Sequence, residues 1–245
     1  MDLKDEKVVL TGATGGIGSA LSQVLANAGA KLILIARTSE KLELLLTKLQ
    51  GQGHKYYAFD FTRVDETEDL CKKIIEENDH IDILINAAGV GIYKNIEDVE
   101  YREWQDSMAI NVTAPFFLTK SLLPLLKKSE KSVIINIGSG MGKIPTACRS
   151  VYCATKYALR GMTMSLAAEF KNTNIHFIHI ALGSTLTEFG PMTLEEKKEE
   201  NLKGKAYFTP EWVAKKFVEI LKNDDFQEEI EIYPSDYKGK EEGAI

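Results

Sequence analysis

Two periodicities alternate along the chain. Short runs rich in Val, Ile and Leu are followed by longer segments in which apolar residues recur every three or four positions. The run over residues 32–36 is almost continuously apolar, which is typical of a strand buried on both faces of a parallel sheet. The expected strands are residues 7–10, 32–36, 55–59, 81–85, 132–137, 175–180 and 230–233.

Helical patterns fill the gaps between these strands. The first apolar stripe runs from Ile17 to Ala28, and Gly29 is placed to end that helix. The next helix is expected to begin at the cap candidate Ser39. Later helices are expected over residues 104–126 and 152–170 and from Thr209 onward. This order predicts an α/β fold: one Rossmann-like, doubly wound parallel sheet of about seven strands with helices on both faces.

Composition narrows the class of protein. The chain has 245 residues, 44% hydrophobic and 27% charged, which excludes a disordered or fibrous chain. No repeat or linker divides it, so residues 1–245 are expected to form a single domain, with a polar tail over 234–245. The net charge of −6 has the wrong sign for holding nucleic acid through its phosphates.

No segment of the chain suggests export, a membrane or a metal. A basic start with an apolar run is missing, and no stretch of about 20 residues is free of polar groups, so a cytoplasmic protein without a membrane partner is expected. Cys71, Cys148 and Cys153 lack metal-ligand spacing and are expected to be reduced thiols. His176 and His179 lie in one expected strand and point to opposite faces, so no metal site is predicted.

A glycine-rich turn follows the first expected strand and leads directly into the first helix. Residues 11–18 read TGATGGIG. Glycines let backbone N–H groups approach a pyrophosphate at the positive end of a helix dipole. An ordinary strand-to-helix turn is the alternative, but this position in the chain favours a dinucleotide-binding turn.

The tip of the second strand indicates which dinucleotide is bound. An acid at that position would accept a hydrogen bond from the adenosine 2′-hydroxyl, whereas an Arg accommodates a 2′-phosphate. The sequence here is Ala36-Arg37-Thr38, without the acid. NADP(H) is therefore favoured over NAD(H), the alternative being that Arg37 is only a solvated surface residue.

One serine, one tyrosine and one lysine form a candidate catalytic group. Tyr152 and Lys156 are four residues apart and would share one face of a helix, and Ser139 lies 13 positions before the tyrosine. A neighbouring ammonium would favour the phenolate and lower the pKa of Tyr152. Tyr152 could then exchange a proton with a carbonyl or alcohol oxygen, to which Ser139 would hydrogen-bond.

Together these motifs resemble the short-chain dehydrogenase/reductase family, over roughly residues 5–233. The resemblance is carried by the glycine turn, Asp60, residues 86–89, Asn111, Ser139, Tyr152 and Lys156. It implies that Asn111, Ser139, Tyr152 and Lys156 are catalytic, that Lys156 also holds the nicotinamide ribose, and that Asn111 links Lys156 to solvent through a water. It also implies that Asp60 receives the adenine amino group. The residues expected to contact the dinucleotide are Gly12, Thr14, Gly15, Gly16, Ile17, Gly18, Arg37, Asp60, Phe61, Asn86, Ala87, Gly89, Tyr152, Lys156, Gly183, Thr185 and Thr187.

Two positions depart from the pattern of that family. Ala87 stands where many relatives carry a second Asn, and a small effect is expected. Leu182 replaces a proline before Gly183, so the turn on the nicotinamide side loses the restriction on φ that proline would impose. Thr185 and Thr187 remain candidates for contacts to the carboxamide and the diphosphate.

By the same resemblance, residues 184–208 would form a substrate lid. Its apolar residues could line a pocket, or a lid helix could pack them on its own domain; they are Phe189, Met192, Leu194, Tyr207 and Phe208. The charge run over residues 195–200 is expected to be a solvated helix face. Four residues of other loops suggest a partly apolar carbonyl substrate: Tyr93, Met141, Ile144 and Cys148.

The leading hypothesis is an NADP(H)-dependent oxidoreductase that interconverts a small-molecule carbonyl and an alcohol. A 3-oxoacyl carrier-protein reductase is one alternative, and it would need a basic docking patch near the site, for which Lys127, Lys128, Lys131 and Lys171 are candidates. A non-catalytic dinucleotide-binding regulator or scaffold is another. The resemblance also implies a homodimer or homotetramer paired through the helices over residues 104–126 and 152–170.

Overall fold

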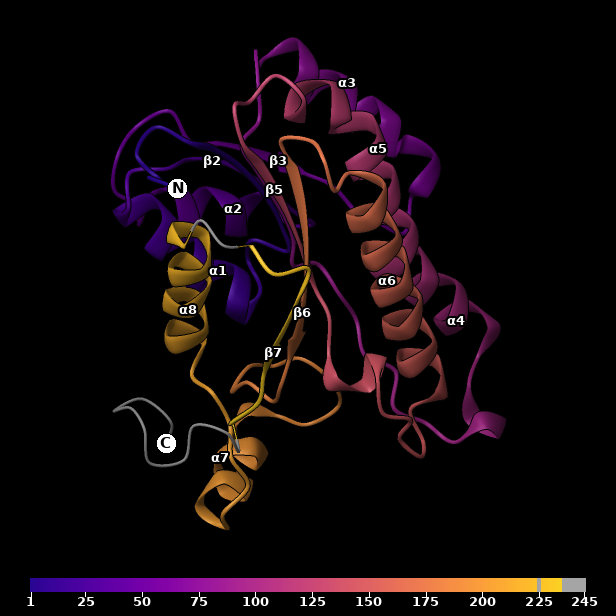
Figure 1. The fold of residues 1–245 in the computed structure, drawn as a ribbon. Helices are drawn as coiled ribbons and strands as arrows, with labels where there is room; N and C mark the ends of the chain where they lie inside the picture. Colours follow the sequence, from indigo (N-terminus) through magenta and orange to yellow (C-terminus); the bar gives the residue numbers. More distant parts are fainter. Residues whose placement is uncertain (224–225, 235–245) are drawn as a thin grey trace.

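One parallel sheet organises the molecule. The computed structural model describes residues 1–223 and 226–234, and within them the strands form a seven-stranded sheet in the order β3-β2-β1-β4-β5-β6-β7, with every neighbouring pair parallel (Figure 1). The strands are β1 Lys7–Thr11, β2 Lys31–Ala36, β3 Lys55–Ala58, β4 Ile83–Asn86, β5 Ser132–Ile137, β6 Ile175–Leu182 and β7 Glu229–Ile232. The predicted doubly wound sheet is confirmed, and its chain order reverses between β1 and β4.

Helices cover both faces of this sheet. The helices are α1 Gly16–Asn27, α2 Ser39–Leu46, α3 Thr67–Glu76, α4 Tyr101–Met108, α5 Ala114–Leu126, α6 Ser150–Glu169, α7 Leu194–Leu202 and α8 Pro210–Lys222. Figure 1 shows α1, α2 and α8 on one side and α3, α5 and α6 on the other, with α7 beyond the carboxyl ends of the strands. Shorter turns are the 3-10 segments η1 Val64–Glu66, η2 Ile96–Asp98 and η4 Gly140–Gly142 and the π-helical segment η3 Ala109–Thr113.

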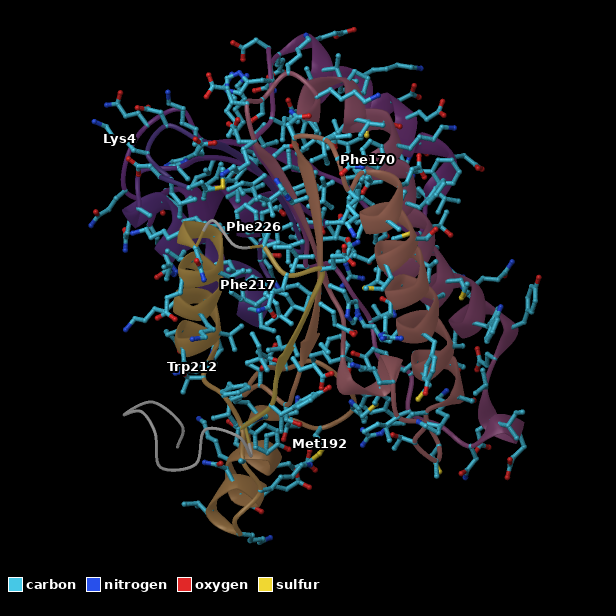
Figure 2. The ribbon with its side chains drawn as sticks, viewed as in Figure 1. Lys4, Phe170, Met192, Trp212, Phe217 and Phe226 are labelled. Carbon is cyan, nitrogen blue, oxygen red and sulfur yellow. The ribbon has the colours of Figure 1, made fainter. Side chains whose placement is uncertain are left out.

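The two layers have separate hydrophobic cores because successive strand side chains point to opposite faces. In β1, Val8 and Leu10 join the core under α1 and α8, whereas Val9 joins the core under α3 and α5. Phe217 projects from α8 toward the sheet and is fully buried (Figure 2). Apolar side chains on both faces explain why the strands read as continuous apolar runs.

The predicted helix ends differ in detail from the observed ones. Gly29 follows α1 with φ of +92°, a left-handed conformation suited to glycine, and so ends that helix as expected. Thr209 caps α8, since its side chain accepts a hydrogen bond from the Trp212 N–H. The prediction of Ser39 as a cap was wrong by one residue: Thr38 occupies the cap position, and Ser39 is the first helical residue.

The helical stretch Tyr101–Leu126 is long and apolar enough to cross a membrane by length and composition. The stretch contains charged residues such as Arg102, Asp106 and Lys120, so it does not contradict the expectation that no stretch of about 20 residues is free of polar groups. Half of its most apolar window is buried inside the protein, and Leu118, Leu122 and Leu125 belong to the core under the sheet. A buried core helix meets the same two criteria, and this one packs as a core helix.

Candidate active site

Six loops meet at the carboxyl edge of the sheet. The glycine turn follows β1, Arg37 follows β2, Ala87 follows β4, Ser139 follows β5 and Gly183 follows β6. Asp60 also lies at this edge, two residues beyond β3. In open α/β sheets, ligands bind beyond the carboxyl ends of the strands where the chain order reverses. The topology therefore brings the predicted site residues to one edge.

The glycine turn is too tightly packed for side chains at Gly12 and Gly18. Gly12 has φ of +66°, and a Cβ placed there would lie 2.8 Å from the backbone of Ala88. A Cβ on Gly18 would lie 2.1 Å from the carbonyl oxygen of Gly12. Helix α1 begins at Gly16 with no side-chain cap and no acid in its first turn. Its first N–H groups lack intrahelical acceptors, so the turn suits an anion such as a diphosphate.

The loop after β6 lies directly against this turn. A Cβ on Gly16 would lie 2.5 Å from Cγ2 of Thr187, so the predicted diphosphate contact Thr187 is next to the first turn of α1. Leu182 extends β6 and pairs with Ile232 of β7. The Gly183 N–H donates to the Ile232 carbonyl at 2.8 Å. Strand pairing therefore holds this turn where the resemblance would place a proline.

The residues expected around the adenosine lie at the edge of the site. Arg37 is exposed, and no hydrogen bond or ion pair joins it to another described residue. Asp60 is half-buried, and its Oδ1 accepts hydrogen bonds from the N–H and the hydroxyl of Thr62, both at 3.0 Å. The Phe61 side chain is buried in the core against Phe59. Only the backbone of Phe61 is left for a dinucleotide contact.

Asn86 does not reach the site with its side chain. It is buried, and its Nδ2 donates to Oδ1 of Asn136 on the neighbouring strand at 2.7 Å. The amide faces its strand neighbour and joins β4 to β5, so only the backbone of Asn86 is left for the predicted dinucleotide contact. Ala87 and Gly89, which follow it, do line the cavity described next.

A cavity of about 800 Å³ opens beside these loops. Ser139, Tyr152 and Lys156 line it, and so do Ile17 and Thr187 from the predicted dinucleotide region. The structure thus brings three of the four predicted catalytic residues to one cavity next to the glycine turn. Within residues 1–223 and 226–234, no group of three or more His, Cys, Asp or Glu side chains lies together as in a metal site.

The first two turns of α6 present the tyrosine and the lysine. Tyr152 and Lys156 are both buried, and the Lys156 ammonium lies 5.6 Å from the centroid of the Tyr152 ring. The Lys156 Nζ donates to the carbonyl of Ile137, at the end of β5, at 2.7 Å. Because Ile137 is two residues before Ser139, this bond fixes the lysine beside the serine. Ser139 in turn accepts a hydrogen bond from the Met141 N–H at 3.2 Å.

Burial controls the protonation of this pair. It raises the pKa of Tyr152 well above the ordinary value for tyrosine; Tyr93 adds to the rise, while a hydrogen bond with Ser139 opposes it. Burial also lowers the pKa of Lys156 to about 8. The net shift of the Tyr152 pKa is therefore opposite to the lowering expected from the neighbouring ammonium, because the phenolate loses its hydration in this site. Tyr152 keeps its proton at neutral pH, as a proton donor must.

Asn111 lies behind the cavity lining. It is in the π-helical segment η3 between α4 and α5, and it is 1% exposed. Its side chain bonds to both backbone groups of Val90 and donates to Oγ1 of Thr155 at 3.0 Å. Asn111 therefore joins the loop after β4 to α6 beside Lys156. A water link of the kind implied by the resemblance would use its backbone carbonyl, because these bonds engage the side-chain amide.

The lid region is partly pocket and partly core. Phe189 lies 5.7 Å from Tyr152 between ring centroids, and Phe189, Met192 and Tyr207 line the cavity (Figure 2 labels Met192 beside α7). Phe208 is fully buried and stacks on Trp212, so the pocket interpretation fails for Phe208. Leu194 is not among the lining residues. The four residues predicted from other loops all line the cavity: Tyr93, Met141, Ile144 and Cys148.

Sequence reasoning missed three cationic side chains of the cavity. Arg149, Lys197 and Lys205 all line it. Lys197 belongs to the charge run that was expected to be a solvated face, yet it is 7% exposed and its Nζ donates to the carbonyls of Thr187 and Phe189. Arg149 precedes Tyr152 by three residues, a helical spacing that could have identified it. Nothing in the local pattern separates Lys197 from its charged neighbours.

The basic patch considered for an acidic carrier protein lies at the wrong edge of the sheet. Lys127, Lys128 and Lys131 precede β5, and Lys171 precedes β6, so all four are at the amino ends of the strands. Lys128 and Lys131 line a second, separate cavity with Glu6 and Asp82. The prediction that these lysines surround the mouth of the site was wrong. Each of them lies in a segment that leads into the amino end of a strand, whereas the site lies at the carboxyl ends.

Known proteins resemble this chain along most of its length. A family model described as short chain dehydrogenase matches residues 6–198. An uncharacterized oxidoreductase of Staphylococcus epidermidis is 32% identical over 191 residues, which are 78% of this chain and 81% of that protein. The alcohol dehydrogenase of Thermococcus sibiricus, solved with 5-hydroxy-NADP, superposes with a TM-score of 0.81 at 25% identity, covering 94% of this chain and 96% of that one. A metagenomic short-chain oxidoreductase in complex with NADP superposes with a TM-score of 0.78 at 25% identity, covering 96% and 99%.

Proposed function

This chain belongs to the short-chain dehydrogenase family, and from that premise we propose that it is an NADP(H)-dependent oxidoreductase that interconverts a ketone or aldehyde and an alcohol. One observation carries the proposal: Ser139, Tyr152 and Lys156 line a single cavity that also reaches the glycine turn. The complexes of the Thermococcus and metagenomic relatives with NADP-type ligands support the choice of cofactor.

The residues present fit a nicotinamide dinucleotide. The glycine turn and the uncapped start of α1 would hold the diphosphate, with Thr187 beside it. Arg37 would contact the 2′-phosphate, and Lys156 has ammonium protons left for the ribose after its bond to Ile137. When bound, the dinucleotide would supply or accept the hydride.

The groups of this chain would handle the oxygen and its proton. Tyr152, protonated at neutral pH, would donate its proton to the carbonyl oxygen during reduction and take it back during oxidation. Ser139 would hydrogen-bond the same oxygen, where negative charge develops. The Lys156 ammonium would stabilise the phenolate left after the proton has moved. Phe189 and Tyr93, whose rings both pack against that of Tyr152, would exclude water from the phenol.

The test is a fluorescence titration with NADPH and NADH, followed by assays of NADPH oxidation with a broad carbonyl panel. Tighter binding of NADPH and turnover of at least one carbonyl are expected. Binding of NADPH with no oxidation by any carbonyl would instead favour the non-catalytic regulator.

A cytoplasmic location, a single domain and a homodimer or homotetramer stay predictions, as does the role of each site residue. Exposed aromatic side chains on α4, α5 and α6 support self-association.

The charge of Arg37 should decide between the two dinucleotides. Replacing Arg37 by Ala removes one charge-assisted contact to the 2′-phosphate, so the Kd of NADPH is expected to rise by about 10- to 100-fold. The Kd of NADH should change by less than about threefold, because NADH lacks that phosphate. The control is Arg102→Ala, an exposed arginine of α4. Equal losses for NADPH and NADH would contradict the role of Arg37.

Reduction should weaken in alkaline solution. Burial lowers the pKa of Lys156 to about 8, so the ammonium is complete below that pH and is lost as the pH rises through it. Since the ammonium stabilises the phenolate, kcat/KM for reduction should fall above about pH 8. A profile from pH 6 to 10 with saturating NADPH measures this. In Lys156→Arg, whose charge persists throughout, the fall should disappear; a wild-type profile that stays flat to pH 10 would refute the role of Lys156.

A further inference from the structure

The charges that line the catalytic cavity all have one sign. Among the described residues, the lining has four cations, Arg149, Lys156, Lys197 and Lys205, and no aspartate or glutamate. The whole chain has a net charge of −6, so this bias is local and opposite to the composition. A cavity of one sign attracts ligands of the other.

Three of these four cations already have oxygen partners within the protein. Lys156 bonds to the carbonyl of Ile137 at 2.7 Å. The Lys197 Nζ lies 2.6 Å from the carbonyl oxygen of Thr187 and bonds to a second carbonyl. Lys205 forms an ion pair with Glu200 at 2.6 Å. Their positions are explained by the catalytic pair and by the packing of the lid.

Arg149 differs from the other three. Within residues 1–223 and 226–234, the guanidinium forms a single hydrogen bond, to Sδ of Met141 at 3.5 Å, and thioether sulfur is a weak acceptor. No carboxylate of those residues pairs with it. The half-buried side chain lies over Tyr93, with Cζ 4.4 Å from the ring centroid. Stacking on the ring holds the guanidinium in place and leaves its N–H donors free of carboxylates.

The guanidinium is close to the expected point of reaction. Tyr93 packs edge-on against Tyr152 with 5.5 Å between ring centroids, so a single aromatic ring separates Arg149 from the catalytic phenol. The charge of Arg149 acts on both tyrosines, lowering the pKa of each against the larger effect of burial. Arg149 and Tyr152 also line the same cavity, so a substrate whose oxygen reaches Tyr152 would share that cavity with the guanidinium.

We infer that Arg149 binds a carboxylate of the substrate, so that the enzyme acts on oxo acids and the corresponding hydroxy acids. This rests on the proposed function and names its substrate class. A guanidinium matches a carboxylate through two parallel hydrogen bonds. One cation without an acid partner suits one negative charge, which favours a carboxylate over a phosphate dianion. The half-buried apolar side chains Met141 and Met192 line the same cavity and would strengthen the contact by limiting the access of water.

Matched pairs of charged and neutral substrates test the inference. The substrates are straight-chain acids with the carbonyl at carbon 2, 3 or 4, each compared with its methyl ester. For at least one position, wild-type kcat/KM should be about tenfold or more higher for the acid. Arg149→Gln should lower kcat/KM for that acid by about 10- to 100-fold and change that of the ester by less than about threefold. Arg149→Lys should restore part of the loss, and Arg102→Gln, on exposed α4, should cause none.

A binding measurement makes the test independent of turnover. Hexanoate and hexanamide are titrated calorimetrically into the NADP⁺-loaded protein, and only hexanoate is expected to lose affinity in Arg149→Gln. The inference would be overturned if the oxo esters were reduced as efficiently as the oxo acids and if Arg149→Gln left the acid-to-ester ratio of kcat/KM unchanged. The proposed function would still stand in that case. Failure to oxidise NADPH with any carbonyl would overturn the proposed function, and hexanoate binding would then decide the inference alone.

Discussion

Replacing Tyr152 by Phe is expected to lower kcat for carbonyl reduction by about 10²- to 10⁴-fold, the usual contribution of a general acid. The phenol would be the group that transfers its proton to the reacting oxygen, whereas the Ser139 hydroxyl would only hydrogen-bond that oxygen and the Lys156 ammonium is held at the Ile137 carbonyl. A Phe ring keeps the contacts with Tyr93 and Phe189, so the cavity should retain its shape. Steady-state assays give kcat, and a fluorescence titration should give an NADPH Kd within about twofold of wild type.

The matched control is Tyr101→Phe, which removes a hydroxyl from an exposed tyrosine of α4. It should leave kcat and the melting temperature unchanged. If Tyr152→Phe turned over a carbonyl as fast as wild type, the proton would have to come from elsewhere, and the assignment of Tyr152 as general acid would fail.

Replacing Gly18 by Ala is expected to raise the Kd of NADPH by about 10²- to 10³-fold. The added Cβ would lie 2.1 Å from the Gly12 carbonyl oxygen and 3.0 Å from the Cα of Ala13, so the turn must move. A displaced turn loses one or two hydrogen bonds from backbone N–H groups to a charged diphosphate, each worth about 1.5–3 kcal/mol. Fluorescence titration measures the affinity, and circular dichroism checks that the fold persists.

The chain contains its own control for this substitution. Gly161 lies within α6, and a Cβ placed there meets no atom within 4 Å. Gly161→Ala should leave NADPH binding unchanged and raise the free energy of unfolding by about 0.5–1 kcal/mol, because alanine loses less backbone entropy in a helix. Should Gly18→Ala bind NADPH as tightly as Gly161→Ala does, the turn would not be the diphosphate site.

Local sequence signals predicted the framework of this site. The apolar runs gave the strands because a parallel sheet buries both faces of each strand, as for Val8 and Val9 in opposite cores. The glycine turn could be identified because close backbone packing excludes side chains at Gly12 and Gly18. The spacing of Tyr152 and Lys156 placed both on one side of α6, facing one cavity. Each of these signals depends on residues close together in the chain.

Other properties depend on distances between segments that are remote in the chain. The pKa of Tyr152 rises because several loops bury it, an effect that the neighbouring ammonium alone would not predict. Lys197 belongs to a charged run in the sequence, but its ammonium donates to carbonyls of the loop after β6. Asn86 turns to Asn136, fifty residues away, and so leaves the site to its neighbours.

The sequence by itself therefore determined the fold, the family resemblance and the candidate catalytic set, because helical and strand periodicities place nearby residues on a common face. Only the tertiary structure decided which charges have partners. It pairs Lys205 with Glu200, and it places the four lysines considered for an acidic carrier protein at the opposite edge of the sheet from the site. Arg149 lies over the ring of Tyr93, and no carboxylate of residues 1–223 and 226–234 pairs with it. Hydration and pairing of a charge depend on everything that surrounds it in space, and this environment is assembled only when the strands and loops come together.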